Sequence, residues 1–301
     1  MTRDFLKVQG KDVPGNMQAY LQYYNLNCSG VEHSHEFFRS RSNEEIFIQS
    51  FTPAAPRGVC YVLHGYFDHS GSMSQLIRHL TSLQFQVVAY DLQGHGLSTG
   101  DRGAIRTFDD YVDLFKEIME RYRKKADQYS VAIAHSTGGA ILMDYLLRYG
   151  GMIETAVLVS PLVRSHNWHM SRAGLILMKR RVTMLPRVYK RNSSNLHYLK
   201  QVKEDPLQNG RIPVGWFQAL VNWQNVLENY PDSDKKILVI QGDKDKTVDW
   251  KYNLAFIKRK FPNCEMRIVR GGNHQLLNER EDFLKQTFNC LDSFIIQGNG
   301  D

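Results

Sequence analysis

The chain has 301 residues, of which 42% are hydrophobic and 23% charged; this excludes a disordered chain and suits one large α/β domain with room for an insertion. No apolar stretch approaches the roughly 18 residues of a membrane-spanning helix, and the N-terminus lacks the apolar core of a secretory signal. The net charge is +7, and all of the positive excess lies between Arg164 and Lys203, where ten basic residues occur without an acidic one.

Short apolar runs rich in β-branched residues alternate with longer segments of helical spacing. The first two runs, over 35–40 and 44–51, alternate like paired strands around a turn, and further strands are predicted over 58–65, 86–91, 131–136, 155–161, 236–243 and 265–272. Helices are predicted between them over 72–83, 108–125 and 138–150. This order predicts an α/β protein with a mostly parallel, doubly wound sheet, whose reactive groups gather at the carboxyl ends of the strands.

About seventy residues interrupt the alternation after the strand at 155–161. They have helical patterns at 171–182 and 216–227 but no clear strand. Because loops of that length without structure are uncommon in compact domains, we expect a helical insertion that covers the sheet. The predicted organisation is a helical extension over 1–34, a core in two parts over 35–162 and 235–301, and a cap over 163–234.

The stretch AIAHSTGGAIL, residues 132–142, places Ser136 directly between a predicted strand and a predicted helix. The nucleophile of a G-x-S-x-G elbow occupies that position, although Ala134 stands where the pattern has its first glycine. Gly138 supplies the second small residue, and Ala134 adds only a methyl group. We therefore expect a positive φ at Ser136, whereas the alternative is a serine that merely caps the helix.

A serine nucleophile requires a base and a group that orients the base. His274 follows the predicted strand over 265–272 and is the candidate base. Asp245 follows the strand over 236–243, where Asp243 and Asp249 compete with it. The chain order of Ser136, then the acid, then His274 is that of doubly wound serine hydrolases.

Two backbone N–H groups are candidates for an oxyanion hole. One belongs to Thr137, the residue after the nucleophile, and the other belongs to Tyr66, in the loop after the strand over 58–65. Both residues directly follow predicted strands.

Six motifs taken together resemble the monoacylglycerol lipases and bacterial lysophospholipases of the α/β-hydrolase superfamily, a serine aminopeptidase-like hydrolase family. In chain order they are LHGYFDHSG, YDLQGHGLSTG, AHSTGG, VSPLV, IQGDKDKTVD and GGNHQLL. The resemblance runs from about His35 to the C-terminus, and its G-x-x-D pattern matches Gly242 to Asp245, which favours Asp245 as the acid. It also implies the α/β-hydrolase fold with a helical cap.

The combination of Ser136, Asp245 and His274, each directly after a predicted strand, predicts a serine hydrolase of carboxylic esters. The resemblance implies a lipid ester, most plausibly a lysophospholipid or a monoacylglycerol. Three alternatives stay open: a serine peptidase or aminopeptidase, a carboxylesterase for small esters, and a hydrolase-fold binding protein without turnover.

The sequence also bears on binding of a cofactor, a metal, nucleic acid or a membrane. No G-x-G-x-x-G or Walker motif occurs, so a nucleotide cofactor is not expected. The histidine pairs are His33/His35 and His166/His169; the second has no nearby acid and no H-E-x-x-H motif occurs, so a metal is not expected. Nucleic acid is not expected either, because no recognition motif accompanies the basic charge. Apolar residues beside Lys179, Arg180 and Arg181 instead predict a cap that contacts anionic membrane, in a cytoplasmic protein at the inner membrane face.

Overall fold

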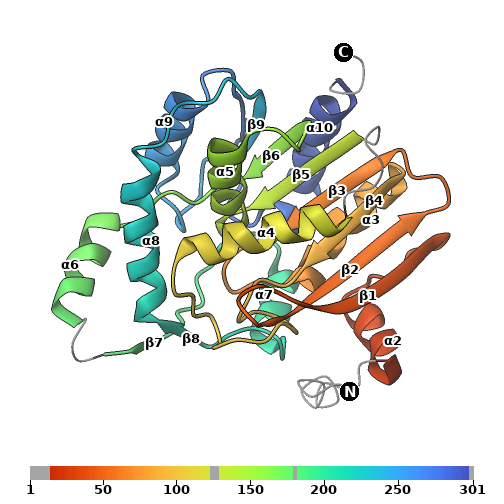
Figure 1. Cartoon of the computed structure of the whole chain (residues 1–301), viewed down its shortest axis with the longest axis horizontal. Coiled ribbons are helices and arrows are strands. Elements are labelled where there is room, and N and C mark those ends of the chain that lie inside the picture. Colours follow the sequence, from red (N-terminus) through yellow and green to blue (C-terminus); the bar gives the residue numbers. More distant parts are fainter. Residues whose placement is uncertain (1–13, 123–128, 179–181, 298–301) are drawn as a thin grey trace.

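The computed structural model describes residues 14–122, 129–178 and 182–297. An eight-stranded sheet forms its centre, in the order β1-β2-β4-β3-β5-β6-β9-β10 (Figure 1). The pairings of β1 with β2 and of β2 with β4 are antiparallel, and the others are parallel. The strands are β1 (Val31–Arg39), β2 (Glu45–Pro53), β3 (Gly58–Leu63), β4 (Phe85–Tyr90), β5 (Tyr129–His135), β6 (Thr155–Val159), β9 (Ile237–Gly242) and β10 (Glu265–Val269).

Apolar side chains cover both faces of this sheet, because successive residues of a strand point to opposite sides. In β3, Val59, Tyr61 and Leu63 join one buried cluster, while Cys60 and Val62 join the other. The first cluster is completed by α4 (Phe108–Tyr122), α5 (Thr137–Tyr149) and α9 (Trp250–Lys260), and the second by α2 (Pro14–Tyr23), α3 (Ser74–Ser82) and α10 (Glu281–Gln297). The predicted doubly wound, mostly parallel sheet is therefore confirmed.

The residues between β6 and β9, here called the inserted segment (163–234), lie to one side of the sheet (Figure 1). Their elements are α6 (Trp168–Met178), β7 (Met184–Pro186), α7 (Leu196–Glu204), β8 (Arg211–Pro213) and α8 (Val214–Leu227). The expectation that this segment holds no strand was wrong, because β7 and β8 pair antiparallel. Three residues are too few for an alternating pattern to be recognised in the sequence.

The helix expected near the N-terminus is present as α2. Tyr20 and Leu21 are buried in the second cluster, which packs α2 against the body of the protein. The first strand of the sheet begins at Val31, slightly before the predicted core boundary. Among the described residues, no helix combines the length and the apolar character that crossing a membrane requires.

Candidate active site

Ser136 occupies a sharp turn between β5 and α5. Its φ of 53° and ψ of −111° confirm the expected left-handed backbone, and its side chain makes no capping hydrogen bond to the helix. The turn is tight on one side, since a Cβ added at Gly138 would lie 2.5 Å from the Leu63 carbonyl oxygen. Ala134, in β5, is fully buried and is compatible with this geometry.

His274 and Asp245 converge on Ser136 from the loops after β10 and β9. His274 Nε2 lies 3.1 Å from Ser136 Oγ, and His274 Nδ1 lies 2.8 Å from Asp245 Oδ2. Both distances are hydrogen bonds in the range that proton transfer between a nucleophile and its base requires. Ser136, His274 and Asp245 are all buried, with exposed fractions of 7% or less.

The two competing acids have other partners. Asp243 accepts a hydrogen bond from the Gly271 N–H at 2.7 Å, and Asp249 caps α9 by accepting from the Tyr252 N–H at 3.4 Å. Asp245 also accepts from the N–H groups of Thr247 and Val248, at 2.7 and 3.1 Å. These bonds fix the carboxylate that faces His274.

The electrostatic environment keeps the Asp245 carboxylate ionised. Burial raises its pKa, but His274 and the two backbone N–H donors outweigh burial, so the pKa of Asp245 is lowered. A second histidine, His135, lies directly before the serine, and its Nε2 donates to the His274 carbonyl oxygen at 3.1 Å. Burial, followed by the nearby His274, lowers the pKa of His135 to about 4, so that its ring is neutral at pH 7. The sequence analysis did not identify His135, although its position beside Ser136 was a signal.

Tyr66 and Thr137 line the same cavity as Ser136. In the described part of the chain, neither N–H donates to a backbone carbonyl, and Thr137 is the first residue of α5, where helix N–H groups lack partners within the helix. The Tyr66 hydroxyl donates to the Gly103 carbonyl at 2.7 Å, and its ring stacks on Trp216 of the inserted segment, with ring centroids 3.9 Å apart. The Tyr66 loop is therefore held from two sides.

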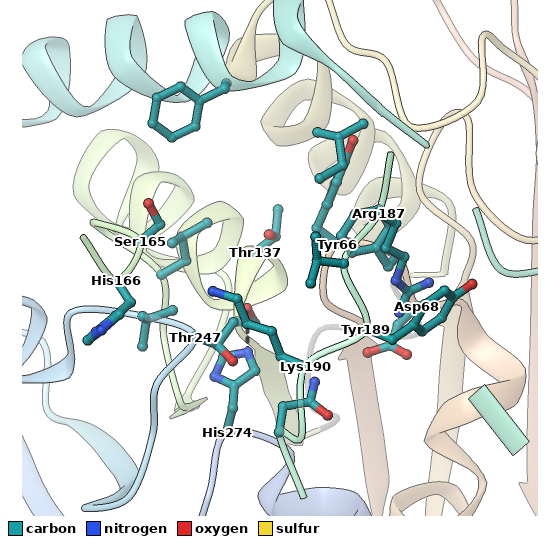
Figure 2. A pocket seen from close by; sticks show the side chains of 18 of the residues that line it. Tyr66, Asp68, Thr137, Ser165, His166, Arg187, Tyr189, Lys190, Thr247 and His274 are labelled. Carbon is teal, nitrogen blue, oxygen red and sulfur yellow. Dashed lines mark hydrogen bonds between the residues drawn. The ribbon is translucent and has the colours of Figure 1, made fainter. Parts of the chain in front are cut away.

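A cavity of about 880 Å³ opens above these residues and reaches under the inserted segment (Figure 2). Its apolar walls come from Leu162, Leu185, Val214, Phe217 and Leu220. Its polar walls include Asp68 and, on the inserted segment, Arg187, Lys190 and Arg191. Figure 2 shows that the Lys190 side chain extends into the cavity on the same side as His274. Arg187, Lys190 and Arg191 could not be assigned to the site from the sequence, because only the fold places them beside it.

Part of the predicted site cannot be placed. Lys179, Arg180 and Arg181, the residues expected to face a membrane, lie outside the described residues. Within the described ranges, no group of three or more His, Cys, Asp or Glu is arranged to hold a metal ion.

The chain is similar to lipases along most of its length. It is 26% identical over 270 residues to a monoacylglycerol lipase of Mycolicibacterium smegmatis, which covers 86% of this chain and 95% of that protein. It is 25% identical over 266 residues to the monoglyceride lipase of Homo sapiens, covering 84% of this chain and 87% of that protein. A phospholipase of Bacillus subtilis is 24% identical over 258 residues, covering 80% of this chain and 97% of that protein.

The chain also resembles a solved lipase structure and matches the profile of a protein family. A soluble variant of monoglyceride lipase from Saccharomyces cerevisiae, in complex with a substrate analog, superposes with a TM-score of 0.77 at 16% identity and covers 90% of this chain and 97% of that one. The profile of the family described as "Serine aminopeptidase, S33" matches residues 54–281. The fold and this match agree with the resemblance read from the motifs, and the chain belongs to this S33 family of α/β-hydrolases.

Proposed function

We propose that this protein is a serine hydrolase of lipid carboxylic esters, acting on lysophospholipids or monoacylglycerols. The observation that carries the proposal is the chain of two hydrogen bonds from Ser136 through His274 to Asp245 beneath a largely apolar cavity. The membership of the chain in a family that contains lipases and esterases supports it.

The proposed reaction begins when His274 Nε2 takes the proton of Ser136 Oγ and the oxygen attacks the ester carbonyl carbon. The Tyr66 and Thr137 N–H groups stabilise the negative oxygen of the tetrahedral intermediate. His274 then gives its proton to the departing glycerol oxygen, which leaves an acyl group on Ser136. A water, deprotonated by His274, attacks this acyl ester, and the fatty acid leaves as Ser136 regains its proton. Asp245 orients the imidazole throughout and stabilises its charged form.

The apolar walls favour a long acyl chain over a small ester. A saturated chain of a dozen carbons or more gains about 0.8 kcal/mol for each CH₂ group that it buries. The cavity, at about 880 Å³, is near the upper end of the range for small-molecule sites, and Leu162, Phe217 and Leu220 line it. A substrate with a short acyl group would leave most of this surface uncovered.

The charge of the cavity disfavours an aminopeptidase. A substrate with a free α-amino group needs an acidic pocket, and among the described residues that line the cavity only Asp68 carries a carboxylate. That carboxylate already accepts a hydrogen bond from Gln275 Nε2 at 3.2 Å. Cationic side chains from the inserted segment outnumber it.

We also propose that the inserted segment contacts the membrane from which such substrates come. Met170 is 74% exposed, Val188 73% and Leu196 67%, and all three belong to this segment. Lys179, Arg180 and Arg181 add positive charge to the same segment, as in helices that lie on anionic lipid. Reversing the charge of these three residues should weaken binding to anionic vesicles and spare the hydrolysis of a soluble ester, and unchanged vesicle binding would contradict the contact.

A fluorophosphonate probe and a series of p-nitrophenyl esters test the proposed function. The wild-type protein should label covalently, Ser136→Ala should not, and kcat/KM should rise with acyl length. Equal labelling of both proteins would show that Ser136 is not the nucleophile. Absence of labelling and of turnover would favour a binding protein, and a preference for acetyl esters would favour a small-ester carboxylesterase.

A further inference from the structure

The walls of the cavity carry a marked excess of positive charge. Among the described residues that line it, the cationic side chains are Arg187, Lys190, Arg191 and Lys203, against the single carboxylate of Asp68. All four cations belong to the inserted segment. Part of the basic segment seen in the sequence therefore lines the site: Arg187 is half-buried there, whereas Lys190, Arg191 and Lys203 are also exposed to solvent.

Arg187 packs against two aromatic rings, and its hydrogen-bond partners among the described residues are neutral. Its guanidinium lies 4.1 Å from the ring centroid of Phe67 and 4.6 Å from that of Tyr189, and its Nη1 donates to Gln208 Oε1 at 2.5 Å and to the Asn209 carbonyl at 3.3 Å. Burial lowers the pKa of Arg187, and Asp68 opposes this effect. An arginine remains charged even so, and a partly desolvated cation with neutral partners is stabilised by an anion that enters beside it.

Lys190 and Arg191 line the same cavity as Ser136 and His274. The Lys190 side chain extends into the cavity (Figure 2), and a flexible ammonium group can follow a phosphate oxygen through several geometries. The chain that carries both residues is fastened to the loop of His274, because the Gln275 N–H donates to the Asn192 carbonyl at 3.0 Å. This bond holds the backbone beside Lys190 and Arg191 against the loop that carries the catalytic base.

Apolar side chains and cationic side chains thus line the same cavity as Ser136. An acyl-glycerol with its ester at Ser136 and its chain against the apolar residues Leu162, Phe217 and Leu220 leaves Lys190 and Arg191 as lining residues for its headgroup. We propose that the preferred substrate is a lysophospholipid whose phosphate headgroup has a net negative charge. This inference rests on the proposed function and adds to it that Lys190, with Arg187 and Arg191, recognises the phosphate.

The test compares four esters with one acyl chain of the same short length, each below the concentration at which it forms micelles. They are a monoacylglycerol, a lysophosphatidylcholine, a lysophosphatidylglycerol and a lysophosphatidic acid. The two anionic lipids should have the highest kcat/KM. In Lys190→Gln, the ratio of kcat/KM on lysophosphatidic acid to that on the monoacylglycerol should fall about tenfold, mainly through KM, because the phosphate contact is made equally in the ground state and the transition state.

Lys200→Gln is the matched control. Lys200 lies on α7 of the same inserted segment, its side chain is 72% exposed, and it does not line the cavity. The Lys200→Gln substitution removes the same charge away from the site. The ratio of kcat/KM on lysophosphatidic acid to that on the monoacylglycerol should therefore stay at the wild-type value. An equal fall in both variants would mean that only the overall charge attracts the lipid and would overturn the inference.

Two further outcomes separate the inference from the proposed function. Similar kcat/KM values for all four lipids in the wild-type protein would overturn the headgroup preference and leave the ester hydrolase in place. Failure to hydrolyse any of the four, together with failure to hydrolyse p-nitrophenyl esters, would overturn the proposed function and the inference with it.

Discussion

The backbone of Gly138 packs directly against the carbonyl oxygen of Leu63. A Cβ at position 138 would lie 2.5 Å from this oxygen and 2.8 Å from that of His64, so the elbow and the end of β3 have no room for a methyl group. Ala134, the residue that departs from the G-x-S-x-G pattern, lies on the other side of Ser136 and its side chain is accommodated.

Gly138→Ala should therefore lower both activity and stability. Moving the elbow away from Leu63 should shift Ser136 Oγ from His274, and overpacking of this kind costs about 1–3 kcal/mol. Fluorophosphonate labelling rates and thermal unfolding check this result. Ala134→Gly is the control: it should stay active and lose about 1 kcal/mol of stability through backbone freedom. This account of the turn would be refuted if Ala134→Gly were inactive while Gly138→Ala kept the labelling rate and the thermal stability of the wild-type protein.

Asp245→Asn should reduce kcat by several orders of magnitude. The amide cannot stabilise the charged imidazole, and it favours the wrong tautomer of His274. Asp243→Asn, two residues away, should retain most of the activity, because Asp243 bonds to the Gly271 N–H rather than to His274. Steady-state kinetics of the two variants, with circular dichroism to confirm folding, decide between the acids. Our assignment would be wrong if Asp243→Asn were the more damaging change.

Tyr66→Phe should have little effect on catalysis, because Tyr66 is proposed to act through its backbone N–H. The change removes the hydroxyl bond to the Gly103 carbonyl, which costs about 1 kcal/mol of stability, and keeps the ring that stacks on Trp216. We expect kcat within about threefold of the wild-type value and a lower melting temperature. A loss of a hundredfold in kcat would instead place the hydroxyl itself at the reacting oxygen.

The stability of the protein should depend on pH through His69 and Asp205, which are buried and 2.9 Å apart. Burial opposes the charge of His69, but Asp205, followed by Asp91 and Asp68, outweighs it and raises the pKa of His69 above its ordinary value of 6.5. Burial likewise raises the pKa of Asp205, but His69 outweighs it and holds that pKa below 3.8, with a further hydrogen bond from the Tyr24 hydroxyl at 2.8 Å.

The two pKa shifts determine how the stability depends on pH. The contribution of His69 is complete below pH 6.5 and is lost as the pH rises through its raised pKa, whereas that of Asp205 is complete above pH 3.8 and is lost as the pH falls through its lowered pKa. The pair therefore stabilises the fold most between these two values. His69→Gln should cost about 3 kcal/mol at pH 5.5 and less at alkaline pH, as measured by urea unfolding. A cost that does not change with pH would contradict the ion pair.

Much of the fold could be predicted from local pattern. The apolar runs at 131–135 and 237–242 are fully buried strands, and the loops directly after them carry Ser136 and Asp245. Position after a strand could not separate Asp243 from Asp245, because both follow the same strand, and only the G-x-x-D resemblance favoured Asp245. In the structure Asp245 bonds to His274, whereas Asp243 bonds to the Gly271 N–H.

What could not be predicted depends on contacts between distant segments. Helix α7 has a capping signal, since Asn195 accepts from the Tyr198 N–H at 3.2 Å, but its polar sequence has no long apolar stripe. The position of Lys190 depends on how residues 187–192 cross the cavity, which no local pattern encodes. The sequence pattern of the basic segment predicts a membrane-facing surface, whereas in the structure four of its basic residues line the cavity.

The inserted segment and the loop of His274 are fastened together at neighbouring points. Besides the bond between Asn192 and Gln275, Glu279 Oε2 accepts from the Ser194 N–H at 2.8 Å and from its hydroxyl at 2.5 Å. A hinged lid could not swing off this cavity as a rigid flap without pulling on the loop that holds the base. Any displacement of the segment on this side would therefore also displace the loop that aligns His274 with Ser136.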